Sequence, residues 1–292
     1  MNILDDIKQQ YRFGGMNQKL IFWNIGCFLV SLIFYQFSTG RFFFPNWLAL
    51  SGDVITSVTF PWTYITYAFL HGGLFHLIFN LIVLNFAGRL FQTFFSEKQL
   101  LGVYILGAIF SGLAYVLAYW FIFPSYNTIL VGASASIMAI LFATVTYAPL
   151  MTVRLLLIGY VKLWHIATVI LILDVLQIGL NNTGGHISHL AGALFGFIFV
   201  KLLRQGTDLT KLISKITDFF MGLFSKNKTS KKKYTPFKEI HINKGSRIYK
   251  TKTPVYKDKN QRQIDEILDK ISRSGYDSLT KEEKEFLFQQ KE

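Results

Sequence analysis

The chain has 292 residues, of which 51% are hydrophobic and 16% aromatic, and it carries a formal net charge of +13. Residues 1–200 contain 8 Lys/Arg and 5 Asp/Glu, whereas residues 201–292 contain 22 and 12. This division is typical of an apolar membrane body with a basic cytoplasmic tail, and it argues against one mixed soluble globule. Nucleic-acid binding by the tail is the poorer interpretation, so we expect no nucleic-acid partner. The single cysteine, Cys27, excludes a disulfide framework and a cysteine metal site.

Six apolar stretches are candidates for membrane-spanning helices, which need roughly 20 residues each. They cover about residues 20–37, 74–94, 100–121, 131–147, 164–180 and 186–203. The first follows a short polar segment, residues 1–17, and lacks a clear small-residue cleavage site, so we expect a retained helix rather than a signal peptide. The sequence therefore predicts an all-α membrane protein with a six-helix domain over residues 18–204.

Lysine and arginine residues in the connections predict the orientation. The N-terminal segment, the turns near residues 89–98 and 154–162, and the tail all carry positive charge, whereas the connections near 122–130 and 181–187 carry none. Positive segments stay on the cytoplasmic side, so both termini are expected to be cytoplasmic. The second, fourth and sixth helices then begin at the outer face.

Three further segments follow the membrane domain. They are an amphipathic membrane-surface helix over 205–225, a basic linker over 226–260 that we expect to bind anionic lipids, and a small helical hairpin over 261–292. In the hairpin, Gly275 can end the first helix, and Thr280 with Glu283 predicts a capping box for the second. The function of the hairpin and the oligomeric state are not legible from the sequence.

Polar side chains gather at the outer ends of three predicted helices. They are His71, His76 and Asn80 at the second, Ser134 at the fourth and His189 at the sixth. Polar groups inside a bilayer are costly, so each is a functional candidate. Because three segments far apart in the chain bring such groups to one depth on one side, we expect a shared site.

The residue types in this site are those of nucleophilic catalysis. A serine attacks an acyl carbon when a base takes its proton, and His189 is the best-placed base. Ser134 and Ser136 compete as the nucleophile, and since they lie about 200° apart on a helix, only one can face the site. His76 and Asn80 share a helix face and can donate hydrogen bonds to an oxyanion.

Small residues near His189 predict close helix packing. Ala191, Gly192 and Gly196 would let the sixth helix approach a neighbour, although such a pattern alone is more often simple packing. Asp174 is the only acidic residue well inside a predicted span, and we interpret it as structural, paired with Lys162 or a polar neighbour.

Two other functional classes fit the sequence less well. Zinc would need ligands such as His71, His76, His186 and His189. The chain has no His-Glu-x-x-His motif and no carboxylate at the outer ends, so we expect no metal and no other cofactor. A transporter would show inverted repeats and more intramembrane charge. The chain shows neither.

In combination, these motifs make residues 18–204 similar to the rhomboid family of intramembrane serine proteases. The motifs are Pro61-Trp62, His71-x4-His76-x3-Asn80 with Gly88 beyond, Gly132-Ala133-Ser134, and His189-x2-Gly192-x3-Gly196. The resemblance implies that Ser134, rather than Ser136, is the nucleophile and that His189 is the base of a dyad without an acid. It implies that His76 and Asn80 stabilise the oxyanion. Supporting positions are His71, Gly132, Ala135, Gly192 and Gly196.

The resemblance also implies a substrate class and a location. Substrates would be transmembrane segments of other membrane proteins, cut near the outer face once their helix unwinds into a hydrated cavity. We expect an integral multi-pass protein of the bacterial inner membrane, in which about residues 38–70 correspond to the family's aromatic loop between the first and second helices. The alternative is a catalytically inactive rhomboid-like protein that binds transmembrane clients.

The chain departs from the family pattern at four positions. Ala135 stands where glycine usually follows the serine, Ser188 replaces the alanine before the histidine, Ala191 replaces a glycine after it, and Thr63 replaces an arginine after Trp62. None of these changes removes a catalytic group. We expect them to affect the rate and the choice of substrate more than the presence of activity.

Overall fold

The structure is a computed structural model that describes residues 2–123, 128–155, 158–180, 182–224 and 259–289. It is mostly helical and divides into two compact units, residues 1–228 and 229–292, which are described separately. The basic linker predicted for 226–260 lies outside the described residues, apart from the last two, which begin a helix.

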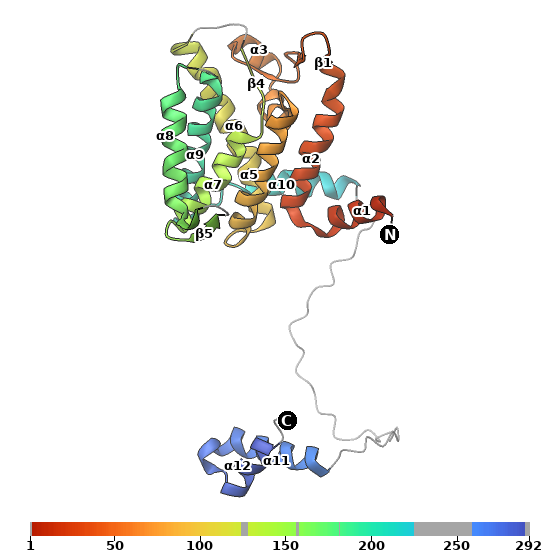
Figure 1. Cartoon of the computed structure of the whole chain (residues 1–292), viewed down its shortest axis with the longest axis vertical. Coiled ribbons are helices and arrows are strands. Elements are labelled where there is room, and N and C mark those ends of the chain that lie inside the picture. The colour runs from red at the N-terminus through yellow and green to blue at the C-terminus, as the bar shows by residue number, and fades with distance from the viewer. Residues whose placement is uncertain (1, 124–127, 156–157, 181, 225–258, 290–292) are drawn as a thin grey trace. The chain divides into compact units, whose positions relative to one another are not determined.

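The first unit is built around a bundle of apolar helices (Figure 1). Its helices are α1 (Ile3–Phe13), α2 (Gly15–Ser31), α3 (Val54–Thr59), α4 (Thr63–Thr66), α5 (Leu74–Gln92), α6 (Glu97–Phe121), α7 (Ser134–Tyr147), α8 (Leu163–Gln177), α9 (Thr183–Arg204) and α10 (Lys211–Phe224). Single 3-10 turns are η1 (Leu32–Phe34) and η2 (Tyr67–Phe69). Each of the six predicted spans corresponds to one helix of the bundle.

Four of these helices are long and apolar enough to cross a membrane. They are Gly15–Phe34, which joins α2 to η1, and α5, α6 and α9. The helices α7 and α8 are apolar but shorter, with 14 and 15 residues. At about 1.5 Å per residue α7 is roughly 21 Å long, less than the roughly 30 Å of a hydrocarbon core. The protein is therefore a membrane protein with four candidate spans and two shorter apolar helices.

The shortest of the apolar helices, α7, is also the most enclosed. Ten of its residues, from Ala135 to Thr144, are buried in an unbroken run. A helix that is apolar all round is one that packs on all sides, and α7 contacts α5, α6, α8 and α9. It forms the centre of the bundle in Figure 1.

Two glycines of α9 bring this helix against the backbone of α7. A Cβ atom on Gly192 would lie 2.2 Å from the carbonyl oxygen of Ala135, and one on Gly196 would lie 2.3 Å from that of Ala139. No side chain fits in either place. The close approach predicted from the glycine spacing is confirmed, and the structure identifies the partner as the helix that begins at Ser134.

Large apolar side chains on the outside of the bundle are exposed. The exposed fractions of Ile33, Phe75, Ile82 and Leu176 are 75%, 75%, 60% and 65%. Apolar surface of this extent is costly in water and typical of helices that contact lipid.

Three two-stranded antiparallel pairs complete the first unit. The strands β1 (Tyr35–Gln36) and β2 (Arg41–Phe42) pair with each other, as do β3 (Leu50–Ser51) with β4 (Ile129–Leu130) and β5 (Thr152–Leu155) with β6 (Gly159–Lys162). Two of these pairs alter the predicted boundaries. The first span ends at Phe34, because the chain turns into β1, and the predicted cytoplasmic turn near 154–162 is a hairpin rich in β-branched residues.

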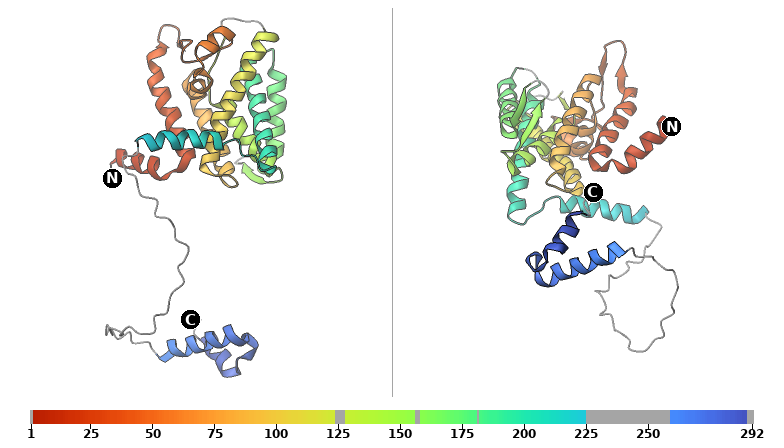
Figure 2. Two further views of the ribbon diagram at one scale, coloured as in Figure 1. Left: turned by 180° about the vertical axis from the view of Figure 1, so that it is seen from behind. Right: turned by 60° about the horizontal axis from the view of Figure 1, so that its bottom comes forward.

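The helices α1 and α10 lie across the same end of the bundle (Figures 1 and 2). The sequence predicted a surface helix over 205–225, and α10 packs against α6 there. Lys98 Nζ of α6 lies 2.8 Å from an Asp218 carboxylate oxygen of α10. Leu212, Ile216 and Phe219 of α10 are exposed and form an apolar face, whereas the predicted binding of this helix to the membrane surface stays a prediction.

The second unit contains α11 (Lys259–Ser274), η3 (Tyr276–Ser278) and α12 (Lys281–Gln289). Gly275 follows α11 with a φ of +79°, a conformation that favours glycine. The predicted capping box is present, because the Thr280 N–H donates to Glu283 Oε2 at 2.7 Å and the Glu283 N–H donates to Thr280 Oγ1 at 3.3 Å. Lys270 joins the two helices through an ion pair with Glu283 at 2.9 Å.

Replacing Gly196 by valine should destabilise the bundle. The added side chain would meet the α7 backbone, and overpacking of this kind lowers the free energy of unfolding by about 1–3 kcal/mol. Thermal unfolding in detergent measures the effect. Gly26→Ala is the matched control, because a Cβ there meets nothing within 4 Å. Equal melting temperatures for Gly196→Val and wild type would contradict the packing account.

Candidate active site

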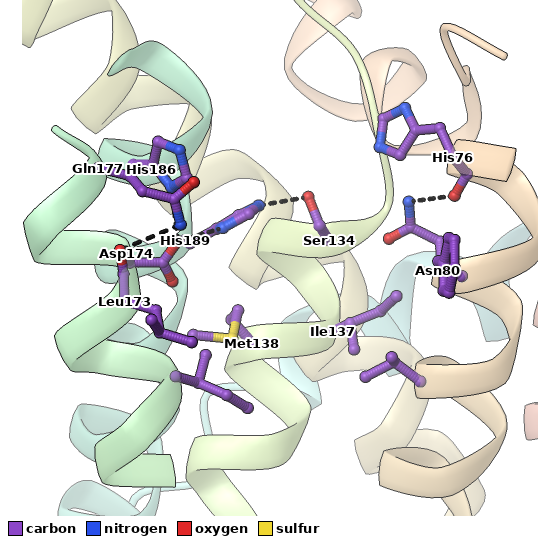
Figure 3. A pocket seen from close by; sticks show the side chains of 13 residues that line it. His76, Asn80, Ser134, Ile137, Met138, Leu173, Asp174, Gln177, His186 and His189 are labelled. Atoms are coloured by element: carbon purple, nitrogen blue, oxygen red, sulfur yellow. Dashed lines mark hydrogen bonds and ion pairs between the residues drawn. The ribbon is translucent and has the colours of Figure 1, made fainter. Parts of the chain in front are cut away.

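Ser134 and His189 form a direct hydrogen bond between α7 and α9. Ser134 Oγ lies 2.7 Å from His189 Nε2 (Figure 3). Ser134 is the first residue of α7, and His189 lies in the second turn of α9, three residues before the glycine that packs on Ala135. The close helix contact therefore places the imidazole beside the hydroxyl.

The backbone before Ser134 is held by several hydrogen bonds. The strands β3 and β4 pair Leu50 with Leu130, and the Gly132 N–H donates to the Tyr67 carbonyl at 2.9 Å. Gly132 has a φ of +130°, and a Cβ there would lie 2.9 Å from the His76 ring. Only glycine fits both the conformation and the space.

Two tyrosines anchor this region to α6. The Tyr67 hydroxyl donates to the Ala108 carbonyl at 2.9 Å, and the Tyr104 hydroxyl donates to the Ala68 carbonyl at 2.7 Å. Both side chains are fully buried. The turn η2 therefore forms a rigid support between α6 and the segment that leads to Ser134.

Ser136 is fully buried and points away from the site. Its exposed fraction is 0%, and its Oγ has no hydrogen-bond partner in the described part of the chain. Its Cα lies close to Gly107 of α6. The two serines therefore have the opposite orientations that their spacing requires, and Ser134 is the one beside His189.

His76 and Asn80 lie on α5, on the other side of Ser134 from His189 (Figure 3). Asn80 Nδ2 donates to the His76 carbonyl at 2.9 Å, and His76 Nδ1 accepts the Gly72 N–H at 3.4 Å. An amide group has two N–H donors, and the bond to His76 uses one of them. The two side chains share one face, as their spacing predicted.

His71 lies behind this pair, in the loop before α5. Its exposed fraction is 0%, and its ring centroid is 5.2 Å from that of His76. Burial, with a smaller contribution from His76, lowers the pKa of His71 to about 3. The ring is therefore neutral at physiological pH and supports His76 by packing.

Asp174 of α8 lies beside the histidines of α9. Its Oδ1 is 2.9 Å from His189 Nδ1 and 2.7 Å from His186 Nδ1 (Figure 3). The structure therefore places an acid beside His189, where the sequence predicted a dyad without one. Of the two partners expected for Asp174, a polar neighbour is confirmed and Lys162 is not. Residue spacing within one helix does not show where a second helix packs.

The sequence contains part of the signal that would place Asp174. Leu163, Ala167 and Asp174 are spaced by four and seven residues, which puts them on one helix face, and the structure shows that this is the buried face of α8. His186 and His189 are three residues apart and share a face of α9. The spacing identifies these two faces, but it does not show that they meet.

The same three side chains form a cluster that offers metal-ligand atoms. Those of Asp174, His186 and His189 all lie within 4.8 Å of one another. His71, His76, His186 and His189, the four possible zinc ligands in the sequence, do not form one group. His71 and His76 pack on each other at one side, and His186 and His189 share Asp174 at the other.

A cavity of about 390 Å³ lies against these groups. Side chains from α5, α7, α8 and α9 line it. The polar ones are His76, Asn80, Ser134, Asp174, Gln177, His186 and His189, and the apolar ones are Phe79, Val83, Ile137, Met138, Ile170 and Leu173. The cavity thus joins a polar wall around Ser134 to an apolar wall that suits membrane-embedded side chains.

Comparison with protein families matches residues 59–206 to the Rhomboid domain. The match covers half of the chain and includes α4 to α9 with every polar residue of the site. The chain belongs to the rhomboid family. This family includes intramembrane serine proteases as well as members without activity.

Beyond the rhomboid domain, residues 251–289 match a family of unknown function, DUF6576. This match covers the helices α11 and α12 of the second unit. A search of curated proteins gives no match.

Replacing Gly132 by alanine should destabilise the rhomboid domain around Ser134. The substitution strains a backbone with φ of +130° and pushes a Cβ against His76, so we expect a loss of about 1–3 kcal/mol in the free energy of unfolding. Thermal unfolding in detergent measures it. Gly73→Ala is the matched control, because Gly73 has an extended φ of 170° and a Cβ there meets nothing within 4 Å. Equal effects of the two substitutions would contradict the account.

Proposed function

We propose that this rhomboid is an intramembrane serine endopeptidase that cleaves peptide bonds in or near transmembrane segments of other membrane proteins. The observation that carries the proposal is the 2.7 Å contact between Ser134 Oγ and His189 Nε2. A hydroxyl at this distance from an imidazole nitrogen can lose its proton to it while its oxygen attacks an acyl carbon. The proposed reaction uses no cofactor.

In the proposed reaction, Ser134 Oγ forms a bond to the scissile carbonyl carbon and its proton moves to His189 Nε2. The peptide C–N bond then breaks, and the leaving amine takes the proton from Nε2. Water, deprotonated by the same nitrogen, hydrolyses the acyl-enzyme and restores the serine. Each step needs Nε2 to accept or donate one proton.

The developing oxyanion needs hydrogen-bond donors. Ser134 begins α7, and no side chain of the described residues caps that end, so the first backbone N–H groups are free to donate. Asn80 and His76 of α5 face the same place from across the cavity. A helix N-terminus with nearby side-chain donors is a suitable oxyanion site.

We propose that the substrate helix unwinds near the cleavage point. In an intact α-helix the Cα atoms lie about 2.3 Å from the axis and the side chains extend the diameter to about 10–12 Å, so side chains would shield the peptide carbonyl carbon from Ser134 Oγ. Glycine and proline, which destabilise a helix, would facilitate unwinding of the substrate.

The distribution of charge supports the proposed orientation. Most of the positive residues of the domain lie in segments at the end of the bundle that carries α1 and α10 (Figure 1). They are Lys8, Arg12, Lys19, Arg89, Lys98, Arg154, Lys162, Lys201, Arg204, Lys211 and Lys215. We propose that this end faces the cytoplasm of a bacterial cell, against anionic lipids, and that Ser134 opens toward the outer face.

Substituting either residue of the Ser134–His189 pair should abolish cleavage. Ser134→Ala removes the nucleophile and His189→Ala removes the base, and each should reduce cleavage of a transmembrane substrate by several orders of magnitude. Purified protein in detergent or vesicles and a labelled transmembrane peptide provide the assay.

Ser136→Ala and His165→Ala are the matched controls, because Ser136 is buried away from the site and His165 packs on Trp164 near the far end of α8. Both should retain activity. Loss of cleavage in Ser136→Ala together with activity in Ser134→Ala would contradict the assignment. A wild type that binds a transmembrane client without cutting it would support the inactive alternative.

Removing the Asn80 amide should slow catalysis without removing it. Loss of one oxyanion donor typically costs roughly 10²- to 10³-fold in kcat. We expect this range for Asn80→Ala, with a small change in KM. Asn85→Ala is the control. Asn85 lies about one and a half helix turns further along α5, and its side chain is hydrogen-bonded to Asn17. Equal kcat values for Asn80→Ala and wild type would exclude a role in the oxyanion site.

A further inference from the structure

We propose that Asp174 is a positioning residue for His189, and that His186 holds Asp174 in place, so that the catalytic group is a chain of four side chains rather than a pair. The inference rests on the proposed protease function. It goes beyond that function by adding an acid, supplied by α8, and a second histidine.

The geometry is that of a continuous hydrogen-bonded chain. Ser134 Oγ lies 2.7 Å from His189 Nε2, and His189 Nδ1 lies 2.9 Å from Asp174 Oδ1. His186 Nδ1 lies 2.7 Å from the same carboxylate oxygen. The side chains come from three helices, α7, α9 and α8, and Figure 3 shows them in this order across the site.

The carboxylate determines which nitrogen of His189 carries the hydrogen. An ionised carboxylate only accepts hydrogen bonds, so the Nδ1 atoms of both histidines must donate to it. A neutral imidazole has one N–H, and with that hydrogen on Nδ1 the Nε2 atom of His189 has a free lone pair. This is the tautomer that can take the proton of Ser134.

The carboxylate also balances the charge that His189 gains. When the proton of Ser134 moves to Nε2, the imidazole becomes a cation in a site of low dielectric. Asp174 is 5% exposed, and within the described part of the chain it forms ion pairs with the two histidines. Its negative charge is therefore directed at the imidazoles, where it favours the charged intermediate.

The distances favour hydrogen bonds over a metal site. Ligand atoms about 2.0–2.1 Å from a tetrahedral zinc ion lie roughly 3.3 Å apart. The contacts of Asp174 Oδ1 with the two Nδ1 atoms, at 2.7 and 2.9 Å, are shorter than this separation. They have the length of charge-assisted N–H···O bonds.

A structural role for Asp174 has to be separated from a positioning role. Apart from Leu163 and Ala167 near its start, Asp174 is the only buried residue of α8, so it also anchors this helix to α9. A purely structural anchor would alter stability and substrate binding. A positioning residue would alter kcat.

The test compares wild type, Asp174→Ala, Asp174→Asn and His186→Ala as full-length proteins, with cleavage of a labelled transmembrane peptide and thermal unfolding measured on each. Asp174→Ala should lower kcat by roughly 10²- to 10⁴-fold with KM changed less than about threefold. Asp174→Asn keeps the acceptor oxygen and loses the charge, so its kcat should lie between those of wild type and Asp174→Ala. His186→Ala should lower kcat by about tenfold.

Thr168→Ala is the control on α8, because Thr168 is exposed and its hydroxyl bonds only within the helix, to the Trp164 carbonyl. It should behave as wild type. If Asp174→Ala does not fold, the nearly isosteric Asp174→Asn is sufficient to test the inference.

Wild-type kcat in Asp174→Asn, or a rise in KM with kcat unchanged in the Asp174 variants, would overturn the inference. Loss of wild-type activity on treatment with EDTA would also overturn it, in favour of a metal site. Cleavage that persists in Ser134→Ala would instead overturn the protease mechanism itself. Activity lost in Ser134→Ala but kept in both Asp174 variants would overturn the inference and leave the protease proposal standing.

Discussion

The contact between α7 and α9 is the interaction on which the site depends. Gly192 and Gly196 let the α9 backbone lie directly against the carbonyl groups of Ala135 and Ala139. A side chain at either glycine would push the helices apart, and a displacement of even 1 Å would break the hydrogen bond between Ser134 and His189. Small residues at a helix interface are common packing devices in membrane proteins. Here the same device determines the distance between two polar groups.

The short length of α7 explains how polar groups occur at membrane depth without disrupting the bundle. Because α7 is too short to cross the hydrocarbon core, its first residue, Ser134, lies within the thickness of the domain. The segment before it is irregular backbone, which lipid does not tolerate unless protein covers it. Its hydrogen bonds to Tyr67 and to β3 supply that cover. The polar side chains of α5, α8 and α9 then meet around one recessed helix end.

Much of this arrangement could be predicted from the sequence. Each predicted span corresponds to an apolar helix. The polar residue types and their predicted depth in the membrane were enough to place Ser134, His189, His76 and Asn80 in one site. Both predictions succeed because the length of an apolar stretch and the polarity of a residue within it are local properties of the sequence. Side-chain partners between helices are not local. The sequence showed that Asp174 was unusual but not that α8 turns it toward His189. Likewise, glycine spacing showed that α9 packs closely without identifying α7 as its partner.

The central claim is that Ser134 is a nucleophile activated by His189. The most direct measurement is labelling of the purified full-length protein with a fluorophosphonate, followed by mass-spectrometric mapping of the modified residue. A fluorophosphonate reacts with a serine only when a base activates it. The account predicts a covalent adduct on Ser134 that disappears in His189→Ala. An adduct on Ser136, or no adduct on the folded wild-type protein, would contradict it.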